Sequence, residues 1–325
     1  MVPLIIGSLP EPNNIGGVVI FTSRLLKSSN YLQANDYIFY STKNRNIFLL
    51  IPLIYRSLFV HFNGSNPVAM FFISLICFLF NKKLILSIHG QIGVHAGASR
   101  WLGWFFNLLQ RYSIILAYKP VVGVGSIKRA LKANKHAIVI PSFIEPEIIV
   151  ESIVDEIISL NKGKTIFCTN ANRLAFDNNG NEIYGISYLI DYFSKQENSL
   201  LVVADTSGTY YEHFNKINPP NVVFINQDIN FSYLLQKSNC FIRFTSTDGD
   251  SLSIMESLFL KVPVIATDCI VRNQSCILCQ FGNIQSLSYA IDSFKEGDFE
   301  ITDVESGVSD YDALYLELSL PADFH

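Results

Sequence analysis

Short apolar runs alternate with segments of helical character along the first half of the chain. The runs that predict strands are residues 3–9, 58–62, 84–89, 121–125 and 137–146. Helices are expected at residues 18–29, directly after the loop that ends in Gly16-Gly17, and at residues 67–80. Strands that alternate with helices are typical of a parallel, doubly wound sheet.

The second half of the chain shows the same alternation of strands and helices, after an interruption at residues 141–164. Strands are predicted at 165–171, 199–205, 222–226, 240–246 and 262–268, with helices at 184–195, 251–260 and 284–294. The stretch 141–164 carries two prolines and an acidic run, which favour a linker that leads into a helix. We therefore expect two α/β domains, residues 1–150 and 151–325, with a boundary near 145–162.

Composition narrows the class of protein. Hydrophobic residues make up 49% of the chain, and the formal net charge is −4 with an isoelectric point near 5.9. A global basic field is therefore absent, and nucleic acid is not an expected partner. Six cysteines include a lone CxxC, Cys276 to Cys279, without a second pair or histidines at zinc-binding spacing. We expect reduced thiols and no metal ion.

The apolar content raises the question of a membrane. The longest apolar run, residues 67–80, is shorter than the roughly 20 residues that a spanning helix needs. Residues 47–60 contain Pro52 and Arg56, and residues 101–118 contain an arginine. These segments favour buried or interfacial helices. The N-terminus has no signal-peptide pattern, so a cytoplasmic protein is expected.

Three acids gather where a predicted strand meets a predicted helix. The stretch 244–268 reads FTSTDGDSLSIMESLFLKVPVIATD and contains Asp248, Asp250 and Glu256. In open α/β sheets, ligands bind at the carboxyl ends of the strands, next to the helix N-termini whose N–H groups suit phosphate. The segment is therefore the main candidate for a functional site.

This stretch resembles the donor-binding motif of retaining GT-B glycosyltransferases of family 4. That family has the frame S-x-x-E-G-x-x-L-x-x-x-E-A followed by a G-x-P-V-I-A-T strand. The chain has Ser246-Thr247-Asp248-Gly249-Asp250-Ser251-Leu252, then Glu256 and the Pro-Val-Ile-Ala-Thr strand. Three further segments match the family in position: Gly16-Gly17, Ile88-His89-Gly90 and Tyr184-Gly185-Ile186.

The resemblance implies a GT-B fold, two Rossmann-like doubly wound domains that face a central cleft. It implies that Glu256 binds the ribose of a nucleotide sugar, Asp248 contacts the sugar ring, and His89 lies near the reacting centre. The donor-binding residues that it implies are Gly16, Gly17, Arg173, Thr247, Gly249, Ser251, Leu252 and Glu256. The N-terminal domain would bind the acceptor, and transfer would retain the anomeric configuration without a metal or other cofactor.

The chain departs from the family at three positions. Asp248 replaces a glutamate, which shortens its reach by about one methylene; Tyr184 occupies the place of a lysine; and Lys261 replaces a glycine. The family's arginine and lysine neutralise the donor diphosphate. Here Arg173 fits the arginine place, and the lysine's charge has to come from Arg243, from another lysine or from backbone dipoles.

The same residues also have simpler interpretations. Asp248-Gly249-Asp250 also fits the D-x-D metal site of GT-A glycosyltransferases, and Asp250 alone fits the N-cap of the following helix. Glu256 as a solvated helix residue and His89 as a structural histidine are the corresponding alternatives. Gly16-Gly17 could form a plain turn.

The resemblance implies a hexosyltransferase-type enzyme in cell-surface polysaccharide synthesis, such as O-antigen or capsule. It would move a sugar from a nucleoside-diphosphate sugar to a hydroxyl of a lipid-linked glycan. The apolar, Lys-flanked segments 67–83 and 101–119 suit peripheral contact with the inner face of a membrane. The alternative is a non-catalytic or degenerate GT-B-fold partner protein that binds sugar nucleotides, which the missing lysine favours.

Overall fold

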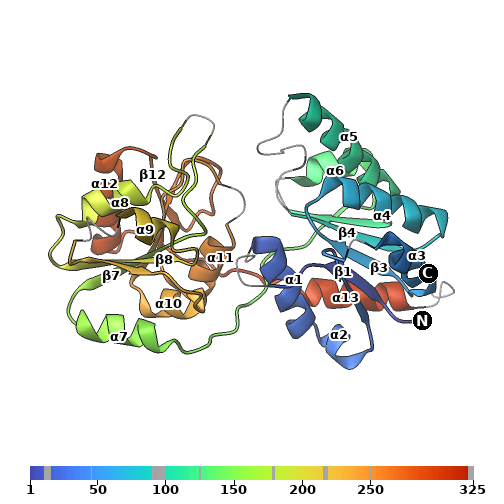
Figure 1. Ribbon diagram of the computed structural model, residues 1–325, viewed down its shortest axis with the longest axis horizontal. Helices are drawn as coiled ribbons and strands as arrows, with labels where there is room; N and C mark the ends of the chain where they lie inside the picture. The colour runs from blue at the N-terminus through green and yellow to red at the C-terminus, as the bar shows by residue number, and fades with distance from the viewer. Residues whose placement is uncertain are drawn as a thin grey trace. The chain divides into compact units, whose positions relative to one another are not determined.

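The computed structural model describes residues 1–10, 16–44, 46–89, 92, 100–123, 126–177, 180–214, 219–248 and 251–320 (Figure 1). The chain forms two compact units. The first unit contains Met1–Ile144 and the segment that begins at Glu305, and the second unit contains Glu145–Val304. Each unit is built around its own parallel sheet of six strands.

The sheet of the first unit has the order β2-β1-β3-β4-β5-β6, and every neighbouring pair is parallel. Its strands are β1 (Leu4–Gly7), β2 (Ile38–Ser41), β3 (Val60–Asn63), β4 (Leu84–Ile88), β5 (Lys119–Val122) and β6 (Ile138–Val139). The strand order reverses between β1 and β3. Strands that the sequence predicted at 3–9, 58–62, 84–89 and 121–125 thus lie side by side in one sheet.

Alternate residues of these strands point into two separate cores. Leu4, Val60 and Leu84 pack with helices α3 (Ile47–Arg56), α4 (Pro67–Leu79), α5 (Arg100–Leu116) and α6 (Ile127–Ala133). Ile5 and Ile85 face the other way, where α1 (Gly17–Ser28), α2 (Asn30–Ala34) and α13 (Val308–Ser319) cover the sheet. The period of two along each strand therefore produces one helix layer on each face.

Helix α4 shows why the longest apolar run folds as a surface helix. Asn66 caps it by accepting hydrogen bonds from the Val68 and Ala69 N–H groups at 2.9 and 3.2 Å, and Pro67 occupies its first turn. Only one stripe is buried, with Met70, Ile73, Ser74 and Cys77 at helical spacing. Within the described part of the chain, every helix is too short or too polar to cross a bilayer.

The sheet of the second unit has the order β12-β11-β10-β7-β8-β9, again with parallel neighbours throughout. Its strands are β7 (Thr165–Ala171), β8 (Ser199–Asp205), β9 (Val222–Ile225), β10 (Cys240–Arg243), β11 (Val264–Thr267) and β12 (Cys276–Cys279). Its helices are α7 (Ser152–Leu160), α8 (Ile186–Phe193), α9 (Thr209–Phe214), α10 (Phe231–Lys237), α11 (Leu252–Phe259) and α12 (Ile284–Glu296). The strand order reverses between β7 and β10.

The structure differs from the predicted division of the chain at its C-terminal end. Helix α13 belongs to the first unit, whereas the sequence assigned all of 151–325 to the second. The side chains of Tyr311 and Tyr315 are fully buried there, and the Tyr315 hydroxyl lies 2.7 Å from Nδ1 of His61. The Asp312 carboxylate accepts hydrogen bonds from the N–H groups that start α2. Amphipathic periodicity predicts a helix but does not say which sheet the helix covers.

The buried His61 makes the stability of the first unit depend on pH. Burial, and secondarily the neighbouring His89, lowers the pKa of His61 to about 3. An unfolded histidine has a pKa of about 6.5, so between these values the unfolded chain binds a proton that the folded chain does not. The free energy of unfolding therefore falls as the pH drops below about 6.5, by up to roughly 1.4 kcal/mol per pH unit.

Urea unfolding of the wild type and of His61→Asn at pH 7 and pH 5 checks this. The wild type is expected to lose about 2 kcal/mol more than the variant between the two pH values. Equal losses in the two proteins would show that the protonation of His61 does not contribute.

Candidate functional site

The main polar cluster of the second unit lies where the order of its strands reverses. Asn170 is near the end of β7, and Arg243 is the last residue of the adjacent β10. Asp248 follows β10 by five residues, before α11 begins at Leu252. In open α/β sheets, the carboxyl ends of strands at such a reversal form the usual ligand crevice.

Asp248 holds two arginines at this point. Its Oδ1 accepts a hydrogen bond from Arg243 Nη2 at 2.8 Å, and its Oδ2 accepts from Arg243 Nε at 3.0 Å. The same Oδ2 accepts from Arg272 Nη1 at 2.9 Å. The Arg243 pair is thus two-pronged, the geometry in which arginine binds a carboxylate best. We call these three residues the Arg–Asp–Arg cluster.

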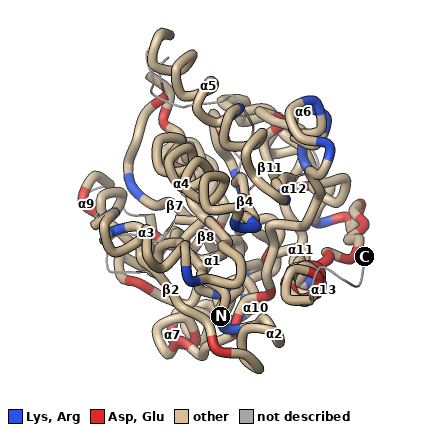
Figure 2. The backbone as a smooth tube through the Cα atoms, turned by 90° about the vertical axis from the view of Figure 1, so that its right-hand side faces the viewer, with Lys and Arg blue, Asp and Glu red and all other residues tan. Residues whose placement is uncertain are grey.

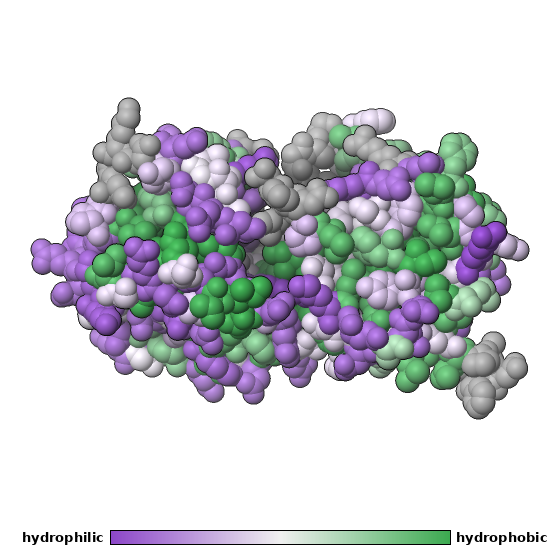
Figure 3. Space-filling view, turned by 60° about the horizontal axis from the view of Figure 1, so that its bottom comes forward, coloured by the Kyte–Doolittle hydropathy of each residue, from purple (hydrophilic) through white to green (hydrophobic). Residues whose placement is uncertain are grey.

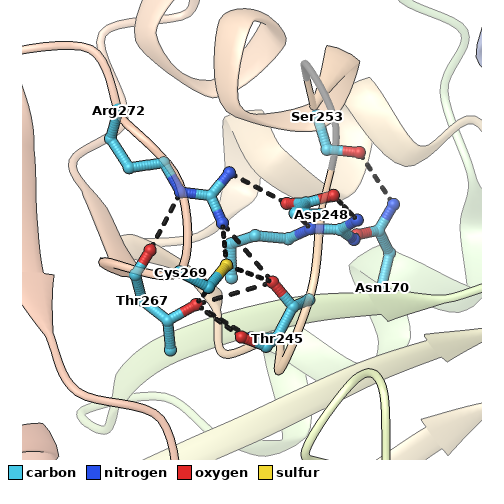
Figure 4. Close-up of polar contacts among 8 residues, drawn as sticks. Asn170, Thr245, Asp248, Ser253, Thr267, Cys269 and Arg272 are labelled. Carbon is cyan, nitrogen blue, oxygen red and sulfur yellow. Dashed lines mark hydrogen bonds and ion pairs between the residues drawn. The ribbon is translucent and has the colours of Figure 1, made fainter. Parts of the chain in front are cut away.

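Arg272 is anchored along its length (Figure 4). Its Nε donates to the Thr267 carbonyl oxygen at 2.9 Å, and its Nη2 lies 3.4 Å from both Thr245 Oγ1 and Cys269 Sγ. Thr267 and Thr245 are joined in turn, because Thr267 Oγ1 donates to the Thr245 carbonyl oxygen at 2.7 Å. Residues at the end of β11 and just after β10 and β11 therefore hold the guanidinium group in place.

Asn170 connects the cluster to the first turn of α11. Its Oδ1 accepts from Arg243 Nη1 at 3.3 Å, and its Nδ2 donates to Ser253 Oγ at 2.8 Å. Figure 4 shows Asn170, Asp248 and Ser253 side by side. The strand ends and the helix that follows the acidic loop thus share one hydrogen-bond network.

The cluster carries a net positive charge in a sheltered place. The side chains of Asp248 and Arg272 are only 7% and 3% exposed. Burial alone would raise the pKa of Asp248, but the two arginines outweigh it and hold that pKa below its usual value. Burial likewise opposes the charge of Arg243, and the bond to Asp248 outweighs it and raises the pKa of Arg243. Two guanidinium groups and one carboxylate leave one positive charge, which suits an anion.

Tyr184 stands where the resembled family has a lysine, and Arg243 lies over it. The Arg243 Cζ atom is 5.2 Å from the centroid of the Tyr184 ring, a cation–π arrangement. Gly185 is the N-cap residue of α8 with φ +56°, and a Cβ atom there would lie 2.5 Å from the Phe244 carbonyl oxygen. Glycine is required at this turn, and Arg243 supplies a cation near the tyrosine ring.

Glu256 lies on α11, three residues after Ser253. It is 4% exposed, and Ser232 Oγ on α10 lies 3.5 Å from its Oε2. The alternative of a solvated helix residue does not fit this burial. A carboxylate in such surroundings is costly unless hydrogen-bond donors surround it.

The other residues that were predicted to bind the donor make few side-chain contacts in the structure. Thr247 is exposed, Ser251 is the N-cap residue of α11 without a side-chain capping bond, and Leu252 is the first residue of that helix. The N-cap is thus Ser251 and not Asp250. Gly249 and Asp250 lie outside the described residues. Arg173 is exposed and lies two residues after the end of β7.

The first unit has its own polar cluster at the reversal between β1 and β3. Asn63, the last residue of β3, donates from Nδ2 to Thr22 Oγ1 on α1 at 2.7 Å. The Asn63 Oδ1 atom is hydrogen-bonded to Nε2 of His89, which follows β4. The His89 ring also lies edge-on to Phe21, with 4.8 Å between the centroids.

His89 is held as a neutral imidazole. Burial lowers its pKa to about 4, so it carries no charge near pH 7. Because Asn63 Oδ1 is an acceptor, the Nε2 atom of His89 donates to it and Nδ1 is left as the acceptor. The histidine thus has a structural contact, and its remaining nitrogen can accept a hydrogen bond from a hydroxyl group.

Gly16 and Gly17 form the start of α1. Gly16 is the N-cap residue with an extended φ of −95°, and both glycines are exposed. A Cβ atom at either position would meet open space. The fold of the first unit therefore does not itself require glycine here, which leaves the predicted role toward a ligand as a proposal.

The described residues do not form a metal site. Among the described residues, no group of three or more His, Cys, Asp or Glu side chains could hold a metal ion. Asp248, half of the D-x-D alternative, faces two arginines instead.

Two residues of the site, Asn170 and Arg272, were not predicted from the sequence. The available signal was their place, at or just after the carboxyl ends of β7 and β11.

Comparison with known proteins gives a consistent result at the level of the fold. No protein-family model and no curated protein matches the chain by sequence. Anabaena Alr3699/HepE, crystallised with UDP, has a TM-score of 0.67 at 12% identity over 98% of this chain and 97% of its own. A Rickettsia africae glycosyltransferase reaches 0.64 at 15% identity over 99% of this chain and 95% of its own.

The lipopolysaccharide outer core galactosyltransferase WaaB has a TM-score of 0.57 at 11% identity, over 98% of this chain and 95% of its own. With two six-stranded parallel sheets flanked by helices, the chain has the GT-B fold of these structures. The fold class predicted from the sequence is confirmed.

Proposed function

We propose that the chain is a retaining glycosyltransferase that uses a nucleoside-diphosphate sugar. The observation that carries this proposal is the net-positive Arg–Asp–Arg cluster at the strand reversal of the second unit. A diphosphate leaving group gains negative charge as the bond from its oxygen to the sugar breaks, and preorganised cations stabilise that charge. The similarity to HepE, which was solved with UDP and with UDP-glucose, supports a nucleotide sugar as donor.

The second unit would bind the donor. Arg243, with Arg272 behind it, faces the diphosphate, and Asp248 keeps the two guanidinium groups in place. Glu256 accepts hydrogen bonds from the two ribose hydroxyls, a task that suits a carboxylate. Thr247, Ser251 and Leu252 offer further polar and backbone contacts at the start of α11.

The first unit would bind the acceptor. One acceptor oxygen would form the new bond to the anomeric carbon while the bond from that carbon to the phosphate oxygen breaks. The departing nucleoside diphosphate takes the electron pair of the broken bond and accepts the proton of the acceptor hydroxyl. Neutral His89 would accept a hydrogen bond from a sugar hydroxyl through Nδ1, and Gly16 and Gly17 would allow phosphate to approach the backbone. The acceptor in this proposal is a hydroxyl of a lipid-linked glycan in O-antigen or capsule synthesis, which is made on the inner face of the membrane.

A second candidate is a non-catalytic GT-B-fold protein that binds sugar nucleotides for a partner. Tyr184 in place of a lysine favours it, because one cation of the family's usual pair is absent at that position. A non-catalytic partner protein would bind the donor without turning it over, whereas an enzyme would bind the donor and turn it over.

The deciding experiment offers the purified chain UDP-, GDP-, TDP- and ADP-sugars with and without EDTA, and records the released nucleoside diphosphate. Membrane extract supplies the acceptor, and NMR of the product reports the anomeric configuration. Turnover that survives EDTA, with retention, supports the proposal. Turnover that requires Mn²⁺ or Mg²⁺ would contradict its metal-free mechanism, and binding without turnover would favour the partner protein.

A further inference from the structure

Acidic residues are missing from a long part of the chain. Residues 37–144 contain 12 Lys and Arg residues and no Asp or Glu, whereas the remainder contains 12 basic and 28 acidic residues. The overall charge of −4 therefore hides a strongly basic segment. A segment of that length without a single carboxylate is unusual for a protein surface, where charges of both signs are normally mixed.

The fold gathers this segment on one side of the first unit. It supplies α3, α4, α5 and α6, which all cover the same face of the sheet. The acids of the first unit that the structure describes include those of α13, which covers the opposite face. Figure 2 shows this contrast, with basic residues on α6 and acidic residues on α13. The α3–α6 layer thus carries charge of one sign.

The same layer exposes large apolar side chains. The two tryptophans of the chain, Trp101 and Trp104, both lie on α5 and are 71% and 60% exposed. Figure 3 shows hydrophobic side chains at the surface of the first unit, on the right-hand side of the view. The other exposed aromatic and large aliphatic side chains of α3, α4 and α5 are Phe48, Leu49, Tyr55, Val68, Phe72, Phe78, Leu79, Tyr112 and Ile115. Exposed apolar surface of this extent marks a binding surface.

Lysines border the aromatic side chains where α3, α4 and α5 end. The Lys82 Nζ atom is 5.8 Å from the ring centroid of Tyr55, and the Lys83 Nζ atom is 5.7 Å from that of Tyr118. Tyr55 also packs edge-on against Phe80, with 5.6 Å between centroids. Aromatic rings with neighbouring lysines are the side-chain pattern of proteins at a membrane–water interface, where rings enter the headgroup region and cations meet lipid phosphate.

We propose that the outer surface of α3, α4 and α5 docks on an anionic lipid bilayer. Arg111, Arg129 and Lys132 line one pocket, but the basic residues as a set are spread along the segment from Lys43 to Lys135. A spread of this kind matches an extended surface of diffuse negative charge. The exposed tryptophans supply apolar contact that a nucleic-acid backbone would not use. Among the residues that the structure describes, no helix is long and apolar enough to cross a bilayer.

Docking on a bilayer would bring the protein to its lipid-linked acceptor. This benefit of docking rests on the proposed transferase function. Trp101 and Trp104 are in the first turns of α5, which follows β4 and His89 in the chain. Binding to the bilayer through the outer surface of α3, α4 and α5 would hold a lipid-linked acceptor beside the first unit, and the start of α5 lies at the sheet edge that carries His89. The binding itself requires neither donor nor transfer.

Sedimentation of the purified chain with lipid vesicles tests the proposal. We expect binding to phosphatidylcholine vesicles that contain phosphatidylglycerol, weaker binding to phosphatidylcholine alone, and release by high salt. The Trp101→Ser/Trp104→Ser variant is expected to bind the phosphatidylglycerol-containing vesicles with an affinity at least about tenfold lower than that of the wild type. Tyr289→Ser is the matched control, because Tyr289 is 74% exposed on α12 of the second unit and should not matter.

A second variant, Lys83→Glu/Arg111→Glu, tests the charge without changing the tryptophans. It should lose the preference for phosphatidylglycerol, and tryptophan fluorescence of the wild type should shift to the blue on vesicles. Equal binding by the tryptophan variant and the control, or binding to RNA in place of vesicles, would overturn the proposal. A failed transferase assay would leave these measurements unaffected, so the two failures are distinguishable.

Discussion

Replacing Asp248 with asparagine is expected to destabilise the second unit by about 3 kcal/mol or more and to abolish donor binding. The substitution leaves the buried Arg272, only 3% exposed, beside Arg243 without the carboxylate that holds them together. Removing one partner of a buried ion pair typically costs about 3–5 kcal/mol, because the remaining charge stays buried without compensation. The guanidinium groups would also lose the geometry that a diphosphate needs.

Urea unfolding followed by circular dichroism measures the stability, and UDP titration calorimetry measures the binding. Asp303→Asn is the matched control, because Asp303 pairs with Lys261 at 2.5 Å on the surface, where the two side chains are 93% and 55% exposed. An exposed pair contributes little, so this control should unfold like the wild type. If Asp248→Asn kept both its stability and its UDP affinity, the cluster would not have the role that we assign to it.

Asp248 also predicts a pH dependence of stability. The arginines hold its pKa below the usual value, so its contribution is present above the unfolded pKa of about 3.9 and is lost as the pH falls through the folded value. Asp248→Asn should therefore reduce the loss of stability at acid pH. Lys261 also lowers the pKa of Asp303, but that pair is exposed to solvent, so the control should reduce the loss much less.

Replacing Glu256 with glutamine is expected to raise the KM for the donor about 30- to 100-fold and to change kcat much less. The ribose lies away from the reacting carbon, so its contacts stabilise the bound donor and the transition state about equally. Losing a charge-assisted hydrogen bond costs about 2–2.8 kcal/mol, which corresponds to this range of affinity. Glutamine keeps the volume of the side chain but turns one acceptor into a donor.

A donor without the two ribose hydroxyls separates this role from a structural one. The wild type should lose affinity for the 2′,3′-dideoxy donor by a similar factor, and Glu256→Gln should lose little more, because the same bonds are already absent. Glu296→Gln, at the exposed end of α12, serves as the control and should behave like the wild type. Losses that simply add in the double combination would show that Glu256 does not contact the ribose.

Much of the candidate site follows from sequence position, because a parallel sheet brings the carboxyl ends of its strands to one edge. The apolar runs therefore predicted two α/β domains and placed Asp248 near a strand end. The GT-B architecture was implied by the resemblance of the stretch 244–268 to a known family. Local sequence contains this information, since turns, strands and helix starts depend on neighbouring residues.

Long-range contacts decided the rest. Arg272 reaches Asp248 from a loop 24 residues later, Asn170 joins them from β7, and α13 returns to the first sheet through His61. Side chains far apart in sequence meet only when strand order is known, and an alternating pattern of strands and helices does not specify that order. The sequence alone predicted most of the strands and helices and the position of the acidic loop, but not the edge strands β2 and β12. The tertiary structure decided which charges neutralise each other, because ion pairing depends on distance in space.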